Sequence, residues 1–129
     1  MIGTPQLLIS DDDRDFRETL RTLLERRGFG TMLAANGAEA VEIVKRESIH
    51  VVLIDMHMPK LTGIEAIREI KEVQQRVPCI LISAAIDDVI RSQAEAAFSL
   101  LEKPVNAQTV THTVHEALES AYGWSGEAS

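Results

Sequence analysis

The sequence predicts an α/β protein in which parallel strands alternate with helices along the chain. Two observations carry this prediction. Five short apolar runs are spread over 129 residues, and several are apolar at consecutive positions, which is typical of strands covered on both faces. The stretches between these runs place apolar residues at helical spacing, so each expected strand is followed by an amphipathic helix.

The apolar runs are short and rich in Leu, Ile and Val, which favours strands over buried helices. Polar or turn-forming residues separate each run from the next. The expected strands are 6–10 (QLLIS), 31–35 (TMLAA), 51–55 (VVLID), 79–83 (CILIS) and 99–102 (SLLE).

The helices are predicted from apolar spacing and from capping residues. Phe16, Leu20, Leu23 and Leu24 share one helix face, and Gly28 is placed to end that helix. Asparagine or threonine stands three residues before glutamate at two further helix starts, which is the spacing of a capping box. The further helices expected are about 37–47, 63–75 and 87–96, and one that follows Asn106.

Strands joined by helices become parallel, and right-handed crossovers place the helices on both faces of the sheet. The expected fold is therefore a flavodoxin-like doubly wound (βα)5 domain, with strand order 2-1-3-4-5. We expect this domain to cover residues 1–122, with 123–129 as a short flexible tail or the start of a linker. In such sheets the functional crevice lies at the carboxyl ends of the strands.

Composition narrows the class of protein. The formal net charge of −7 argues against a direct nucleic-acid partner, because phosphate backbones require a basic surface. No apolar run is long enough to span a membrane, and no stretch resembles a signal peptide. The single Cys79 lies in an apolar run and is expected to be buried and inert. A cytoplasmic protein with no membrane partner fits these features.

Polar side chains stand at or just after the end of four of the five expected strands. Each one alone also suits a structural role, as an acidic helix start, a turn residue or a solvated side chain. Their joint position at one sheet edge favours a shared functional site over separate structural roles. These residues are Asp11, Asp12 and Asp13 after the first strand, Asp55 at the end of the third, Ser83 at the end of the fourth and Lys103 after the fifth.

This set of groups suits the transfer of a phosphoryl group. Asp11 and Asp12 would hold Mg²⁺, which prefers carboxylate oxygens and offsets their mutual repulsion. Asp55 would accept the phosphoryl group as an aspartyl phosphate. Lys103 would neutralise the charge of that group, and Ser83 would donate a hydrogen bond to it. Asp13 is expected to cap the following helix, and His50 to be solvated at a strand start.

Four short motifs stand at or near the ends of the expected strands: LLISDDD (7–13), LIDMHMPKLTG (53–63), ILISA (80–84) and LLEKP (100–104). No single motif is strong, but the ordered set is highly specific. Through this set the chain resembles the receiver domain of two-component response regulators over about residues 6–122.

The resemblance implies a role for each matching residue. The metal ligands would be Asp11, Asp12, Asp55 and the backbone carbonyl of His57. Asp55 would also be the phosphoacceptor, Ser83 the switch hydroxyl and Lys103 the contact to the phosphoryl group. The donor would be a phosphohistidine on a sensor histidine kinase or a histidine phosphotransfer protein, and the signal would pass to a downstream protein partner. The Lys103–Pro104 bond would be cis.

The sequence departs from the family pattern at a few positions. Ser10 stands where an apolar residue is usual, and Leu100 stands where the family usually has an aromatic residue that takes part in switching. His57 and Ala85 occupy two positions that tune the lifetime of the phosphoryl group. The expected consequence is a switch that does not depend on an aromatic side chain at position 100.

Two other functions remain open at this point. A haloacid-dehalogenase-like phosphatase also uses an aspartate nucleophile after its first strand, and Asp11, Asp13 and Asp15 give a similar spacing. A degenerate receiver would bind partners without phosphorylation, although Asp55 and Lys103 are both present. The preferred prediction is a signalling module that assists its own phosphorylation and is not an enzyme for outside substrates.

Overall fold

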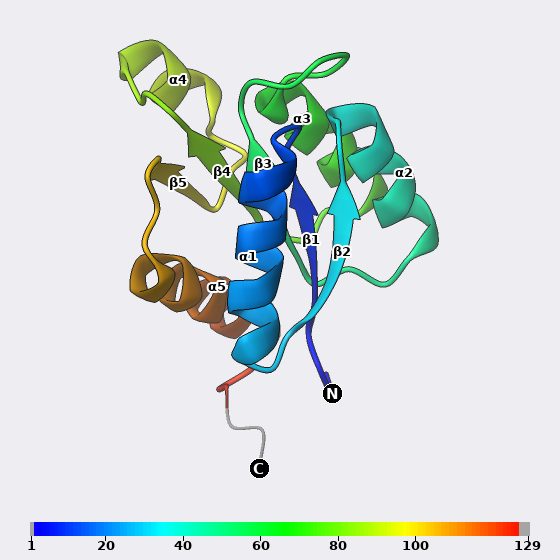
Figure 1. The fold of residues 1–129 in the computed structure, drawn as a ribbon. Coiled ribbons are helices and arrows are strands. Elements are labelled where there is room, and N and C mark those ends of the chain that lie inside the picture. The colour runs from blue at the N-terminus through cyan, green and yellow to red at the C-terminus, as the bar shows by residue number, and fades with distance from the viewer. Residues whose placement is uncertain (1, 127–129) are drawn as a thin grey trace.

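A computed structural model describes residues 2–126 (Figure 1). Strands and helices alternate along the chain, and all strands pair in parallel in the order β2-β1-β3-β4-β5, as predicted. The elements are β1 (Gln6–Ser10), α1 (Arg14–Arg26), β2 (Gly30–Ala34), α2 (Gly37–Arg46), β3 (Val51–Asp55), α3 (Gly63–Val73), β4 (Cys79–Ser83), α4 (Asp88–Gln93), β5 (Ser99–Glu102) and α5 (Ala107–Tyr122).

Four elements differ from their predicted bounds, although α2 and α3 differ only in ending one and two residues earlier, at Arg46 and Val73. β2 begins and ends one residue earlier than expected, because Gly30 pairs with Gln6 and its N–H donates to the carbonyl of Pro5 at 2.9 Å. α4 covers only Asp88–Gln93 of the predicted 87–96. Every residue of α4 is exposed or half-buried, so this helix lacks the apolar packing that usually extends a helix.

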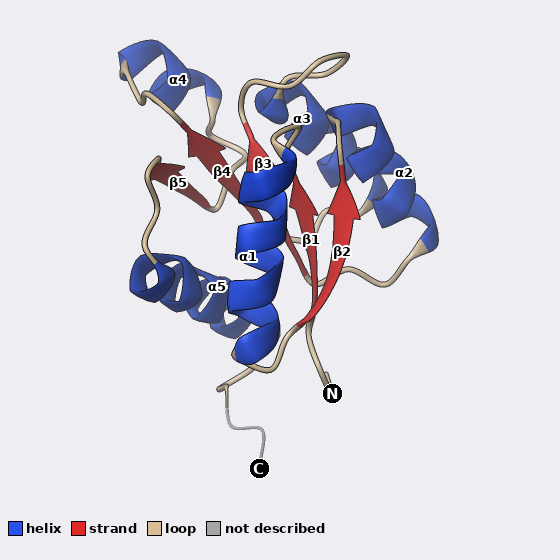
Figure 2. Ribbon diagram, viewed as in Figure 1, coloured by secondary structure: helices blue, strands red, loops and turns tan. Residues whose placement is uncertain are grey.

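The helices cover both faces of the sheet, with α1 and α5 on one face and α2 and α3 on the other (Figure 2). Strand side chains alternate between the two faces. Leu7 and Ile9 of β1 pack toward α1 and α5, whereas Leu8 packs toward α2 and α3. Both faces of the central strands are therefore buried, which explains why the strands are apolar at consecutive positions.

The first helix shows how local sequence sets the element bounds. Asp13 caps its N-terminus and accepts a hydrogen bond from the backbone N–H of Phe16 at 3.2 Å, as predicted. Gly28 follows its C-terminus with a φ of 94°, a left-handed conformation that glycine adopts without strain. This turn directs the chain back into β2, whose carboxyl end then lies beside that of β1.

The amino ends of the strands lie at the edge opposite the predicted site (Figure 1). The expectation that His50 is solvated is wrong. Its side chain is half-buried and its Nδ1 accepts a hydrogen bond from the backbone N–H of Gln6 at 2.9 Å. The hydroxyl of Tyr122 donates to the His50 carbonyl at 2.8 Å, which ties the end of α5 to the start of β3. Neither contact is visible in the local sequence, because Gln6 and Tyr122 are both distant from His50 in the chain.

Residues just after α5 also pack against the domain. The Trp124 ring lies 5.8 Å from the ring of Phe29 and 5.3 Å from that of His115, measured between centroids. The expected tail or linker thus begins with a packed tryptophan. Residues 127–129 of the predicted tail lie outside the described residues.

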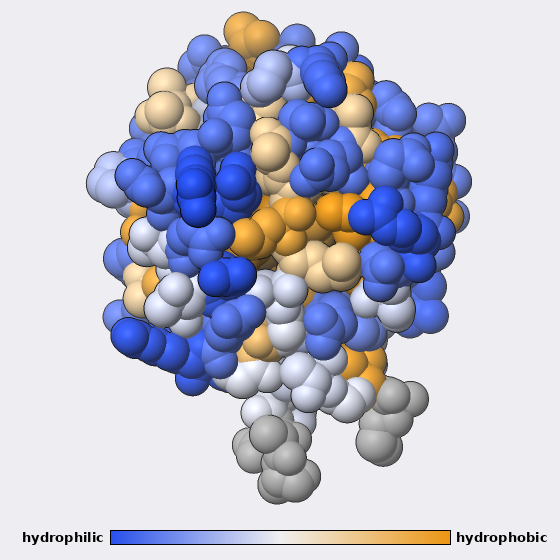
Figure 3. Space-filling view, turned by 45° about the vertical axis from the view of Figure 1, so that its right-hand side comes forward, coloured by the Kyte–Doolittle hydropathy of each residue, from blue (hydrophilic) through white to orange (hydrophobic). Residues whose placement is uncertain are grey.

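The face of the molecule in Figure 3 is mostly hydrophilic and the single thiol is buried, in line with the acidic composition and the apolar sequence around Cys79. The space-filling view shows a mostly hydrophilic face with an apolar band across its middle (Figure 3). Cys79 is fully buried, and burial raises the pKa of its thiol to about 12, which keeps it protonated. Among the helices of residues 2–126, none combines the length and apolar character that crossing a membrane requires.

Candidate functional site

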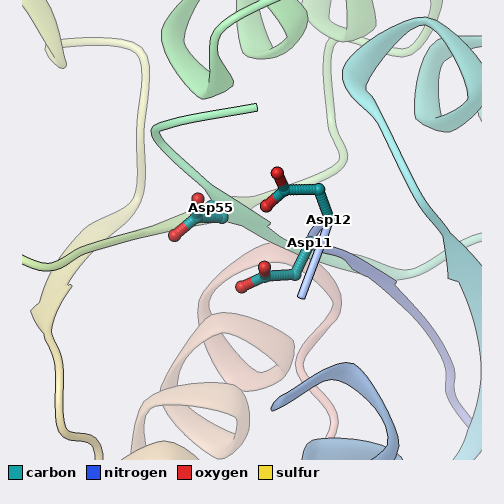
Figure 4. Close-up of side chains that lie close together, drawn as sticks. All are labelled: Asp11, Asp12 and Asp55. Carbon is teal, nitrogen blue, oxygen red and sulfur yellow. The ribbon is translucent and has the colours of Figure 1, made fainter. Parts of the chain in front are cut away.

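The polar residues predicted from strand ends do meet at one edge of the sheet. Asp11 and Asp12 follow β1, and Asp55 is the last residue of β3, which pairs with β1. Figure 4 shows the three carboxylates side by side above the end of the sheet. One oxygen from each lies within 4.8 Å of the others, so the cluster has the size and the hard oxygen donors that suit a divalent cation.

The three carboxylates lie in different surroundings. Asp11 is 1% exposed and Asp55 is 6% exposed, whereas Asp12 is exposed at the rim. Burial raises the pKa of Asp11, and the nearby charge of Asp55 raises it further, although hydrogen bonds from Asp13 and Lys103 oppose the shift. The cluster therefore holds its negative charge at a cost that a bound cation would offset.

Lys103 follows β5 and reaches across β4 to the acidic cluster. Its Nζ lies 3.1 Å from Oδ2 of Asp11 and 3.1 Å from Oδ1 of Asp55. Burial opposes the charged ammonium, but the hydrogen bonds and the charges of the two carboxylates together outweigh burial and raise the pKa of Lys103. The amine is therefore a permanent cation beside Asp55, where it can neutralise an anion attached to that carboxylate.

The loop after β3 is held tightly around Asp55. The N–H of His57 donates to Oδ2 of Asp55 at 3.1 Å, and the N–H of Gly63 donates to the carbonyl of Met56 at 2.8 Å. A Cβ atom at Gly63 would lie only 2.5 Å from the carbonyl oxygen of Asp55. Thr62 and Glu65 form the predicted capping box at the start of α3. Both the carboxylate and its backbone are thus fixed.

The hydroxyl of Ser83 lies at the end of β4, which pairs with β3, where Asp55 is the last residue, and with β5, which Lys103 follows. It donates to the carbonyl of Ala85 at 2.9 Å and accepts from the Ala85 N–H at 3.4 Å. Ser83 is buried, while Ala85 is exposed. In this structure the hydroxyl therefore engages the β4–α4 loop, and a turn about its side-chain bond would free it.

The Lys103–Pro104 peptide bond and the side chain of Ser10 also lie beside the site. The Lys103–Pro104 peptide bond is cis, as the resemblance implied. The hydroxyl of Ser10 can donate its one proton to the carbonyl of Asn36, at 3.3 Å, or to Sδ of Met58, at 3.4 Å, on the α2 and α3 side of the sheet. This polar residue in an apolar position thus contacts two loops beside the site.

Sequence reasoning missed two residues of α1. Lys103 Nζ lies 4.2 Å from the ring centroid of Phe16, and Nη1 of Arg17 donates to the backbone carbonyl of Asp11 at 2.7 Å. The sequence pattern places Phe16 only on the apolar face of the helix. Its position in the first helical turn after the acidic cluster indicates that Phe16 lies near the site. The contact with Lys103 is not visible in the sequence, because Lys103 is far away in the chain.

The doubly wound sheet, the carboxylate cluster and the lysine define a phosphoryl-accepting type of signalling domain. A family model for the response regulator receiver domain matches residues 7–115. This chain belongs to that family, as the sequence motifs indicated. Receiver domains are the signalling modules of two-component systems, and the match gives no support to a haloacid-dehalogenase-like phosphatase.

Known relatives include both long and short proteins. The chain is 31% identical over 117 residues to the transcriptional regulatory protein GlrR of Escherichia coli, which covers 89% of this chain and 26% of that protein. It is 30% identical over 115 residues to sporulation initiation phosphotransferase F of Bacillus subtilis, covering 88% of this chain and 93% of that protein. The chain thus spans about a quarter of the first relative and nearly all of the second.

A solved structure shares the fold. The response regulator protein TrrA of Thermotoga maritima, in complex with Mg²⁺–BeF, superposes with a TM-score of 0.83 and 27% sequence identity. The match covers 89% of this chain and 100% of that one. The predicted fold class and strand order are confirmed by this likeness together with the sheet itself.

Proposed function

We propose that this receiver accepts a phosphoryl group on Asp55 from a phosphohistidine of a sensor histidine kinase or a histidine phosphotransfer protein. The observation that carries the proposal is the position of Lys103, whose Nζ lies 3.1 Å from both Asp55 and Asp11. A carboxylate nucleophile beside a permanent cation is an arrangement that suits phosphoryl transfer. The name of the B. subtilis phosphotransferase relative supports this chemistry.

In the proposed step an oxygen of Asp55 forms a bond to phosphorus as the bond from phosphorus to the donor imidazole breaks. The imidazole leaves with the electron pair of that bond. Lys103 holds the ammonium against the phosphoryl oxygens and neutralises their charge. The N–H of His57 keeps Asp55 in its orientation, with one oxygen accepting a hydrogen bond at 3.1 Å. Ser83 would turn from Ala85 and donate to the new group.

The carboxylates of Asp11, Asp12 and Asp55 would hold Mg²⁺, together with the backbone carbonyl of His57. The cation would neutralise charge on the transferring group. Two observations support this cofactor: the oxygens cluster within 4.8 Å, and the TrrA relative was solved with Mg²⁺–BeF.

We further assign the protein to the cytoplasm, with residues 1–122 as the receiver and 123–129 as the tail or linker start. Its output would be a changed surface for a downstream protein partner, since the net charge of −7 disfavours direct contact with nucleic acid. It would assist its own phosphorylation and turn over no outside substrate.

Intact mass spectrometry with acetyl phosphate tests the proposal. The parent should gain one phosphoryl group in Mg²⁺ and none in excess chelator. Asp55→Asn should gain nothing, whereas Asp88→Asn, which removes an exposed acid on α4, should behave as the parent does. A full gain in Asp55→Asn would show that another residue is the acceptor. A parent that stays unmodified would instead favour an interaction domain that works without phosphorylation.

A further inference from the structure

The aromatic ring of Phe16 lies against the ammonium group of Lys103. The distance from Nζ to the ring centroid is 4.2 Å, well inside the range of about 6 Å in which a cation is attracted to an aromatic face. The Lys103 side chain is 24% exposed, so part of its hydration shell is removed. A cation–π contact gains strength under such partial desolvation.

The ring and the carboxylates act on the ammonium in different ways. A lysine ammonium has three N–H donors, and Asp11 and Asp55 lie at hydrogen-bond distance from it. The face of Phe16 attracts the positive charge without a lone pair that would fix one donor in direction. The ring can therefore hold the ammonium in place while a donor stays available for a group attached to Asp55.

Phe16 is itself well fixed. Its backbone N–H donates to the cap residue Asp13 at 3.2 Å, and its half-buried side chain packs against the core between the sheet and α1 and α5. Lysine, in contrast, has a flexible four-carbon stem with many rotamers. A rigid ring beside a flexible cation reduces the number of positions that the cation samples.

From these contacts we infer that Phe16 is a positioning residue for Lys103, which it holds over Asp55 in the geometry that phosphoryl transfer uses. The inference rests on the proposed function of Asp55 and extends it to a side chain that carries no polar group. The interaction depends on the aromatic face and not on apolar volume alone. An aliphatic residue at position 16 should fill the space but should not attract the ammonium of Lys103.

Nuclear magnetic resonance can detect the contact without any phosphorylation. Because Nζ of Lys103 lies 4.2 Å from the ring centroid, the ring current should shift the resonances of the adjoining Cε protons upfield in the parent. Phe16→Leu should remove this shift, and Phe16→Tyr, which keeps the aromatic face, should retain it. The same three proteins should be ranked by their rate of phosphorylation with acetyl phosphate in excess Mg²⁺. Phe16→Leu should be roughly two- to fivefold slower, and Phe16→Tyr should recover the parent rate.

Two controls separate positioning from packing. Leu23→Ala removes apolar contact from the same helix and the same core, away from Lys103, and should leave the rate within a factor of about 1.5. Trifluorophenylalanine at position 16 keeps the shape of the ring while it weakens the negative face, so it should slow the reaction as Phe16→Leu does.

Two results would overturn the inference. One is a parent without an upfield shift of the Lys103 protons. The other is a Phe16→Leu variant that keeps the parent rate while the ring-current shift is lost. Failure of the proposed function would look different, because the shift would be present in a parent that acetyl phosphate does not modify.

Discussion

Nζ of Lys103 lies 3.1 Å from Oδ2 of Asp11, although 92 residues separate them in the chain. The same ammonium lies 3.1 Å from Oδ1 of Asp55, so one side chain joins the ends of β1, β3 and β5. The two carboxylates are buried, and the lysine offsets part of their repulsion. The behaviour of the site without metal should therefore depend on how many carboxylates share that one cation.

Removal of the outermost carboxylate should relieve repulsion in the absence of metal. Asp12→Ala should hold or raise the melting temperature without Mg²⁺, since an exposed acid makes only a small contribution to packing. It should also lose the stabilisation that Mg²⁺ gives the parent by mass action, which is about 2.7 kcal/mol at a hundredfold excess over Kd. Thermal unfolding at several Mg²⁺ concentrations measures both effects.

The matched control is Asp15→Ala, which removes another exposed carboxylate, three residues along the chain and outside the cluster. It should keep the full response to Mg²⁺. If Asp12→Ala shows the same response as the parent, Asp12 is not a ligand.

A methyl group at Gly63 should disturb Asp55, the proposed phosphoacceptor. The new Cβ would lie 2.5 Å from the Asp55 carbonyl and 2.7 Å from Cδ1 of Leu81, and the backbone oxygen cannot move without shifting the loop. Gly63→Ala should lower the free energy of unfolding by about 1–3 kcal/mol and slow phosphorylation. Gly3→Ala, whose Cβ would meet nothing within 4 Å, should change neither quantity. Equal behaviour of the two variants in denaturant unfolding would show that the loop tolerates the methyl group.

His50 should make stability depend on pH at the edge opposite the site. Burial lowers the pKa of His50 below its usual 6.5, because removal from water disfavours the charged form of the ring. The unfolded chain thus binds the proton more readily than the folded chain does. This contribution to stability should be complete above about pH 6.5 and should be lost as the pH falls toward the folded pKa.

Melting temperatures between pH 5 and pH 8 check this expectation. Asn places an acceptor oxygen close to the position of Nδ1 but does not titrate, so His50→Asn should flatten the acid side of the curve. His112→Asn, which removes an exposed imidazole on α5, should keep the parent curve. An unchanged slope in His50→Asn would assign the pH dependence to other groups.

Phosphorylation should alter the β4–α4 region more than β5. Ser83 now bonds to Ala85, and every residue of α4 is exposed or half-buried, so little packing opposes a rearrangement there. Leu100 packs against the core on the α3 side and has no ring or phenol to exchange between two positions. Hydrogen exchange on phosphorylated and free protein should therefore differ mainly at about 84–97, with little change at 98–102.

Asp55→Asn treated with the same phosphodonor is the control and should show no difference in exchange. Leu100→Tyr should leave partner binding unchanged, since position 100 takes no part in this switch. A dominant change centred on Leu100 in the phosphorylated parent would contradict the expectation.

The sequence by itself determined the fold and the place of the site. Consecutive apolar residues such as those of 51–55 indicated strands buried on both faces, and cap residues such as Thr62 marked where helices begin. These signals are local, because they depend on periodicity and on neighbours in the chain. Parallel strands then bring their carboxyl ends to one edge, so Asp11, Asp55 and Lys103 could be grouped before any distance was known.

Only the tertiary structure decided which side chains touch. The ring of Phe16 against Lys103, the hydroxyl of Ser83 on Ala85 and the imidazole of His50 on Gln6 each depend on a side-chain rotamer. Two of these three contacts also join segments far apart in the chain. Rotamers are selected by packing against neighbours that strand order and helix docking supply, and that information is spread over the whole sequence. Local patterns therefore located the site, while the packed fold set its geometry.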